Sequence, residues 1–206
     1  MLDSSDANGI SANGRQKSNE KIAVYGGSFD PITNGHLDII TRALTIFDKV
    51  IVGVAAHPNK KTMFTTAERI ELIEAALAER GIQNAQVASV TGLLADLALE
   101  VGATAFIRGL RNGVDYENEQ PMVIHNRRLT ALGGNSGDAG DGGTREPEGD
   151  DDASAMGIET VLLVGDPALG HISSSFIKEL ASYGSDISML APSVVVAAVQ
   201  AKYERA

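Results

Sequence analysis

Short apolar runs alternate along this 206-residue chain with stretches in which apolar residues recur at helical spacing. The runs predict strands at 21–26, 50–56, 85–90, 103–107 and 158–164. The helical patterns cover 34–47, 65–81, 93–101, 114–129, 173–183 and 192–203. Because strands alternating with helices of this length form parallel sheets, we expect an α/β fold: a doubly wound, five-stranded parallel sheet.

The chain is long enough to bury one good core, and we expect a single domain over 21–206. The polar first twenty residues predict a disordered tail at 1–20. Residues 131–157 hold eight glycines and seven acidic residues against one arginine, with almost no large apolar side chains. Such a segment cannot bury enough surface to offset the entropy of ordering, so we expect a disordered insertion at about 131–157.

Composition narrows the function classes. The net charge of −10 argues against nucleic-acid binding, which usually needs a basic surface. The absence of cysteine excludes disulfides, thiolate metal sites and a cysteine nucleophile, and His57, His125 and His171 lack metal-ligand spacing. No apolar run is long enough to cross a membrane, and the first residues lack the pattern of a signal peptide. We therefore expect a cytoplasmic protein with no protein-held metal.

Ligands of parallel α/β folds bind at the carboxyl ends of the strands. Here glycine, hydroxyl and basic residues gather at those ends, in the stretches GGSFDP, AAHPNKK, IRGLR and VGDPALGHISSS. Gly26 and Gly27 let the backbone approach a ligand closely, and the helix expected from Asn34 points its free N–H groups toward the same space. His36, in the first turn of that helix, could reach an anion held there.

The stretch GGSFDPITNGH, ending at His36, resembles the T/S-F-D-P-x-x-x-G-H signature of the nucleotidyltransferase superfamily, which implies a Rossmann-like fold. Lys60 in HPNKKTMF, then IRGLR, DYENE, NRRL and ISSSFIKE, follow in the order found in bacterial phosphopantetheine adenylyltransferases. The resemblance extends over 21–130 and 158–202. It implies transfer of AMP from ATP to 4'-phosphopantetheine, giving dephospho-coenzyme A and pyrophosphate.

The residue chemistry agrees with that reaction. The nucleophile would be a phosphate that is already ionised at neutral pH, so no general base is needed. Catalysis would rest on positioning and on charge stabilisation at the α-phosphorus. The family resemblance further implies Mg²⁺ bound with ATP, a homohexamer, and feedback binding of coenzyme A.

The resemblance also assigns roles. His36 would stabilise the transition state by donating to the α-phosphate, while Lys60 and Arg108 would hold the phosphate of 4'-phosphopantetheine. Ser28 would contact both substrates. The remaining ATP-binding residues would be Phe29, Gly109, Leu110, Arg111, Glu119, Leu169, Gly170, His171, Ile172, Ser173, Ser174 and Ser175.

Some positions have an alternative interpretation. Leu94 matches a pantetheine-lining position but is equally an ordinary core leucine, and Arg111 could form a salt bridge at a helix start. Three residues depart from the family pattern: Asn118, Leu169, and Pro121, which would remove a helix hydrogen bond and kink the chain. Two other functions stay open: a nicotinate or nicotinamide mononucleotide adenylyltransferase, which prefers H-x-G-H and lacks IRGLR, and a non-catalytic nucleotide-sensing module.

Overall fold

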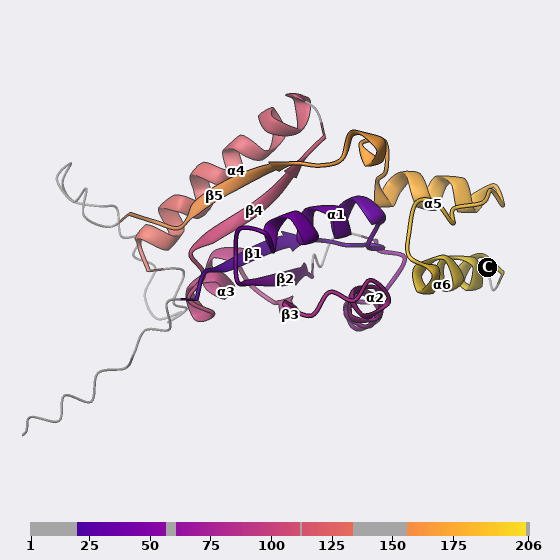
Figure 1. The fold of residues 1–206 in the computed structure, drawn as a ribbon, viewed down its shortest axis with the longest axis horizontal. Helices are drawn as coiled ribbons and strands as arrows, with labels where there is room; N and C mark the ends of the chain where they lie inside the picture. Colours follow the sequence, from indigo (N-terminus) through magenta and orange to yellow (C-terminus); the bar gives the residue numbers. More distant parts are fainter. Residues whose placement is uncertain (1–19, 57–60, 112, 134–155, 205–206) are drawn as a thin grey trace, which may run out of the picture.

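The computed structural model describes residues 20–56, 61–111, 113–133 and 156–204. Within them, five parallel strands form one sheet in the order β3-β2-β1-β4-β5 (Figure 1). The strands are β1 (Ile22–Gly27), β2 (Lys49–Ala55), β3 (Ala85–Val90), β4 (Ala105–Leu110) and β5 (Glu159–Val164). The predicted five-stranded parallel sheet is confirmed.

Helices follow the strands as the periodicity indicates. They are α1 (Asn34–Ala43), α2 (Thr66–Glu79), α3 (Leu94–Glu100), α4 (Gly113–Ala131), α5 (Ser174–Ser182) and α6 (Ser193–Glu204), with a short 3₁₀ helix at Pro167–Leu169. The 3₁₀ helix is an addition to the expected elements. β4 continues three residues past the predicted end, through Leu110, so that its last residues reach the ligand-binding edge of the sheet.

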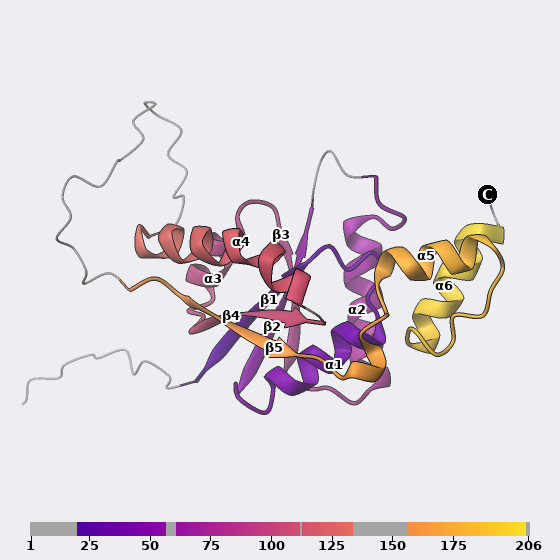
Figure 2. The ribbon, with the colours of Figure 1, turned by 90° about the horizontal axis from the view of Figure 1, so that it is seen from above.

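The sheet is covered on both faces. On one face α1 and α2 pack over a cluster that includes Tyr25 and Ile107, with α6 against α2 and α5 against α6. On the other face α3 and α4 enclose a smaller cluster around Val24 and Phe106. Figure 2 shows α5 and α6 side by side at one end of the molecule. β1, β2, β3 and β4 contribute side chains to both clusters because alternate side chains point to opposite faces of the sheet.

The chain reverses its direction of growth across the sheet at β1. It runs outward from β1 to β2 and β3, then returns to place β4 on the other side of β1. In open parallel sheets a ligand crevice lies at such a reversal, outside the carboxyl ends of the two neighbouring strands. Here those ends are the glycines of β1 and the segment from Arg108 to Leu110 of β4.

Capping boxes fix the starts of two helices. The predicted box at α2 is present: Glu68 N–H donates to Thr65 Oγ1 at 3.2 Å, and the Thr65 N–H donates to Glu68 Oε2 at 2.7 Å. At α1, Thr33 is the N-cap and His36 occupies the third helical position. The glutamate of the usual motif is thus replaced by a histidine in α1.

α4 runs as one helix through Pro121, although the proline lacks an N–H for the helical ladder. None of the helices in the described part of the chain is long and apolar enough to span a membrane. Residues 1–19 of the tail predicted at 1–20 lie outside the described residues, as do residues 134–155 of the insertion predicted at about 131–157.

Candidate active site

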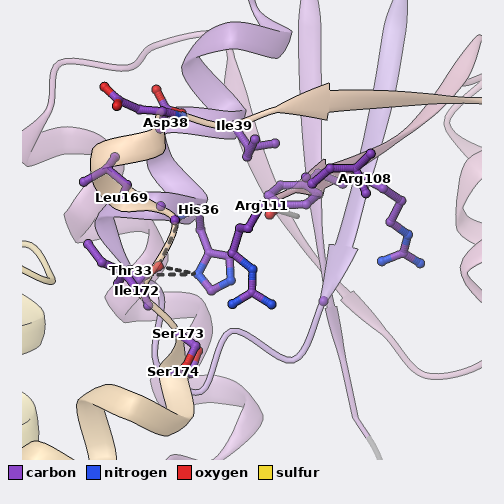
Figure 3. A pocket seen from close by; sticks show the side chains of 18 of the residues that line it. Thr33, His36, Asp38, Ile39, Arg108, Arg111, Leu169, Ile172, Ser173 and Ser174 are labelled. Carbon is purple, nitrogen blue, oxygen red and sulfur yellow. Dashed lines mark hydrogen bonds between the residues drawn. The ribbon is translucent and has the colours of Figure 1, made fainter. Parts of the chain in front are cut away.

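A cavity of about 490 Å³ lies at the carboxyl ends of β1 and β4, where the sheet order predicts a ligand crevice (Figure 3). The loops after β1, β4 and β5 form its walls, together with the first turns of α1 and α5. The described residues therefore bring together three of the four chemically distinctive strand ends. The fourth, after β2, contains Lys60, which lies outside the described residues.

The turn after β1 has an unusual backbone conformation. Phe29 has a φ of 45°, a left-handed conformation that costs a bulky residue about 1–3 kcal/mol. Its buried ring compensates by packing edge-on against the rings of Tyr25 and His36, with centroid distances of 5.4 and 5.1 Å. A Cβ on Gly27 would come within 2.9 Å of the Phe29 ring, so this turn requires the glycine.

The His36 ring is oriented by the N-cap residue of its own helix. The Thr33 backbone N–H donates to His36 Nδ1 at 3.1 Å, and Thr33 Oγ1 lies 3.1 Å from the same nitrogen. A backbone N–H can only donate, so Nδ1 is an acceptor and the ring proton resides on Nε2. No protein hydrogen bond to Nε2 is found among the described residues, and the ring lines the cavity.

Burial, with the nearby charge of Arg111, lowers the pKa of His36 to about 4. The imidazole is therefore neutral near pH 7, in the tautomer that presents Nε2–H to the cavity. A neutral donor of this kind can stabilise negative charge on a ligand without giving up its proton.

Arg111 lies beside His36 at the cavity wall (Figure 3). Its guanidinium makes two hydrogen bonds of 3.0 Å to Asp115, and its backbone N–H donates to the same carboxylate at 2.8 Å. The helix-start salt bridge named as an alternative for Arg111 is thus present. It is compatible with ligand binding, since the side chain also lines the cavity.

Arg108 extends from β4 in a different direction from Arg111 (Figure 3). Its Nη1 donates to the Gly26 carbonyl at 2.8 Å, and its Nε lies 3.2 Å from Glu119 Oε2. Arg108 thus links the ends of β1 and β4 to α4. The Arg108 guanidinium also compensates the negative charge of Glu119, a residue that the sequence predicted to contact ATP.

The serine run begins α5 with its first backbone N–H groups at the cavity. Ser173 is the N-cap and accepts from the Phe176 N–H at 3.1 Å, and the Ser174 hydroxyl donates to the Pro31 carbonyl at 2.7 Å. Two of the three hydroxyls therefore hold the helix start against the turn after β1. The backbone N–H groups of Ser174 and Ser175, which have no partner within the helix, are the groups suited to bind an anion.

Asp30 joins three segments behind the cavity. Its buried carboxylate accepts from the Met63 and Phe64 N–H groups at 3.0 and 2.9 Å and from Lys178 Nζ at 2.8 Å. Burial by itself would raise the pKa of Asp30, but these three donors lower it on balance. The carboxylate therefore stays ionised and connects the turn after β1 both to α5 and to the segment before α2.

Arg69 of α2 also supports the turn after β1. Its buried guanidinium donates to the carbonyls of Ser28 and Ala55, at 2.6 and 3.0 Å, and to Thr66 Oγ1 at 2.9 Å. Ser28 and Ala55 follow or end two neighbouring strands. Arg69 consequently fixes their relative position.

Most of the residues assigned from sequence line this cavity. They are Ser28, Phe29, His36, Arg108, Gly109, Leu110, Arg111, Glu119, Leu169, Gly170, Ile172, Ser173, Ser174 and Ser175. His171 and Leu94 are not among the lining residues. His171 is exposed, with its ring near Phe176, and Leu94 packs in the cluster on the other face of the sheet, beside Gly26.

Other lining residues were not anticipated from the sequence. They are Tyr25, Thr33, Gly35, Asp38 and Ile39, whereas Gly26, Gly27 and the segment 164–167 belong to strand ends that the sequence had already indicated. Asp38 accepts from the Asp166 backbone N–H and from Arg42 Nε, both at 2.8 Å, and so ties the loop after β5 to α1. The spacing of Thr33 and His36 is that of a capping box, a signal that could have identified Thr33 as the residue that orients the histidine.

Comparison with known proteins gives a consistent result. Residues 24–180 match the family model described as cytidylyltransferase-like. A phosphopantetheine adenylyltransferase from Levilactobacillus brevis is 39% identical over 183 residues, covering 89% of this chain and 97% of the relative. The enzyme of the same name from Bifidobacterium longum is 41% identical, covering 85% and 90%. That from Corynebacterium glutamicum is also 41% identical, covering 88% and 96%.

Among solved structures, one named as a nicotinate-nucleotide adenylyltransferase from Vibrio parahaemolyticus superposes with a TM-score of 0.57, covering 91% of this chain and 97% of the other. At 18% identity this likeness supports the fold alone. The family model and the curated relatives decide the family. The chain belongs to the cytidylyltransferase-like family and, within it, to the phosphopantetheine adenylyltransferases.

Proposed function

We propose that this protein transfers AMP from ATP to 4'-phosphopantetheine, giving dephospho-coenzyme A and pyrophosphate. The observation that carries the proposal is the neutral His36, whose Nδ1 accepts from Thr33 and whose Nε2–H is left for a ligand. The relatives that bear the name of this activity are 39–41% identical over most of the chain.

In the proposed reaction a phosphate oxygen of 4'-phosphopantetheine attacks the α-phosphorus of ATP. The new P–O bond forms as the bond from the α-phosphorus to the bridging oxygen breaks, and pyrophosphate carries away that electron pair. His36 Nε2–H donates to a non-bridging α-oxygen as its negative charge grows. Arg111, beside His36, adds positive charge at the same place.

The first turn of α5 is proposed to hold the outer phosphates of ATP. The backbone N–H groups of Ser174 and Ser175 and the positive end of the helix dipole suit the β- and γ-phosphates. ATP is the magnesium complex in this proposal. Of the carboxylates that line the cavity, Asp38 and Glu119 are paired with arginines and Asp166 accepts from the Ala168 N–H, so the ATP phosphates and water are the better ligands for the ion.

Arg108 and Lys60 remain the proposed ligands of the 4'-phosphopantetheine phosphate, with Ser28 near both substrates. Arg108 would exchange or share its bond to Glu119 when the phosphate binds. The resemblance also supports three wider proposals: a cytoplasmic enzyme, a homohexamer and feedback binding of coenzyme A. Light scattering of the purified chain, and turnover measured with added coenzyme A, test the last two.

The decisive experiment measures pyrophosphate release from ATP with 4'-phosphopantetheine, with nicotinate mononucleotide, and with neither acceptor. Release that depends on 4'-phosphopantetheine is expected. Release that depends only on the mononucleotide would favour the other adenylyltransferase activity. Binding of ATP without release in any mixture would favour a nucleotide-sensing module.

A further inference from the structure

One buried polar group at the cavity has no role in the chemistry described so far. Tyr25, near the end of β1, is only 7% exposed, and it lines the cavity. Its ring packs against Phe29 edge-on and lies 6.4 Å from the His36 ring, centroid to centroid. No hydrogen bond to its hydroxyl is found among the described residues.

Among the described residues, the fully buried side-chain atoms without a hydrogen-bond partner are Arg69 Nε and Thr160 Oγ1, so the Tyr25 hydroxyl, which has no protein partner either, is open to the cavity. A hydroxyl that is open to a cavity and bonded to no protein group can bond to water or to a ligand that displaces the water. A ligand that brings a charged acceptor would form a stronger hydrogen bond with this hydroxyl than a neutral acceptor does. The Tyr25 hydroxyl is therefore arranged for a partner that the folded chain itself does not supply.

The surrounding charges indicate the chemistry of that partner. Arg108, Arg111 and Glu119 are the charged groups that act on Tyr25. Glu119 is already ion-paired with Arg108, so its charge is compensated. Arg108, Arg111 and His36 line the same cavity, and the acceptor that fits this set of donors and cations is anionic.

Resting on the proposed function, we propose that the Tyr25 hydroxyl donates a hydrogen bond to a phosphoryl oxygen of a bound substrate. Burial, opposed in part by Arg108, raises the pKa of this hydroxyl well above its ordinary value, so the proton needed for donation is retained. The phosphoryl oxygen could belong to ATP or to 4'-phosphopantetheine, and separate binding measurements distinguish the two.

The test compares Tyr25→Phe with Tyr203→Phe. Both changes remove one hydroxyl and keep the ring. The Tyr203 hydroxyl donates to the Lys178 carbonyl at 2.8 Å within the protein, and Tyr203 does not line the cavity. The two variants therefore separate a hydroxyl that serves the ligand from one that serves the fold.

For Tyr25→Phe we expect the Kd of ATP or of 4'-phosphopantetheine to rise about tenfold or more, as for a lost bond to a charged acceptor. Its melting temperature should not fall, because the unliganded protein loses no hydrogen bond. Tyr203→Phe should lower the melting temperature and leave both Kd values unchanged. The substrate whose Kd rises in Tyr25→Phe is the one that supplies the phosphoryl oxygen.

Unchanged Kd values for both substrates in Tyr25→Phe would overturn the proposal, even with the wild type fully active. If the wild type shows no turnover, the proposed function fails separately. The role of Tyr25 is then decided by the Kd of sodium tripolyphosphate. Weaker binding by Tyr25→Phe than by the wild type supports it, whereas equal binding, or none by the wild type, overturns it.

Discussion

The backbone N–H of Thr33 donates to Nδ1 of His36 across 3.1 Å, within the first turn of α1. Because the donor belongs to the backbone, the bond persists when the threonine side chain changes. It keeps the single proton of the neutral ring on Nε2, the nitrogen left for a ligand. Thr33 therefore both caps α1 and orients the ring of His36.

Replacing His36 with alanine should lower kcat by about a hundredfold or more, the effect typical of losing one preorganised donor to a developing negative charge. The melting temperature should change little. Pyrophosphate release under saturating substrates measures the effect. His125→Ala, at an exposed position of α4, is the matched control and should retain full activity. An active His36→Ala would contradict the proposed role.

The pKa of His36 also predicts how stability depends on pH. The ring binds a proton near pH 6.5 when unfolded and near pH 4 when folded. Between these values the unfolded chain binds more protons, so stability falls as the pH is lowered from about 6.5 to 4. Urea unfolding across this range should show a shallower decline for His36→Gln than for the wild type. Parallel declines of stability in the two proteins would exclude His36 as the source of the pH dependence.

The Asp30–Lys178 ion pair should contribute far more to the free energy of unfolding than the Glu68–Lys202 ion pair. The Asp30 side chain is 4% exposed, whereas Glu68 and Lys202 are 39% and 37% exposed. Removing one partner of a buried pair costs about 3–5 kcal/mol, and an exposed pair contributes about 0–1 kcal/mol. Urea unfolding of Asp30→Asn and Glu68→Gln measures both. Similar losses of unfolding free energy in the two variants would show that burial does not determine how strongly these ion pairs stabilise the protein.

Shortening the acidic insertion should leave turnover intact. The described residues on either side are already joined, since the Ile158 N–H donates to Thr130 Oγ1 at 2.8 Å and Arg127 pairs with Glu159 at 2.6 Å. Replacing residues 134–155 with a short Gly-Ser linker therefore keeps the contacts between α4 and β5. Steady-state kinetics should match the wild type. A loss of activity in a protein that still melts normally would reveal a role for the segment.

The sequence predicted the sheet and most of the cavity because both depend on local patterns. Alternating periodicities gave the strands and helices, and the Gly26–His36 motif brought with it the residues known for that family. The capping box at Thr65 was likewise readable from four adjacent letters. Sheet order then places the ends of β1 and β4 together without further information.

Contacts between distant residues could not be predicted in the same way. Asp30 and Lys178 are 148 positions apart, and Arg108 meets the Gly26 carbonyl 82 positions away. Such pairs depend on how helices settle on the sheet, which no local pattern encodes. Tyr25 was overlooked for a related reason: in the run IAVYG it is indistinguishable from an ordinary buried strand residue. The role of Lys60 stays a prediction.

The three hydrogen bonds of Arg69 have a mechanical consequence. One rigid, planar group spans the carbonyls that follow β1 and end β2, and also reaches the first residue of α2. Sliding of either strand end would break a hydrogen bond to Arg69, which is buried, so water is not available to replace that bond. The turn after β1, which lines the cavity, is therefore held in place before any substrate arrives.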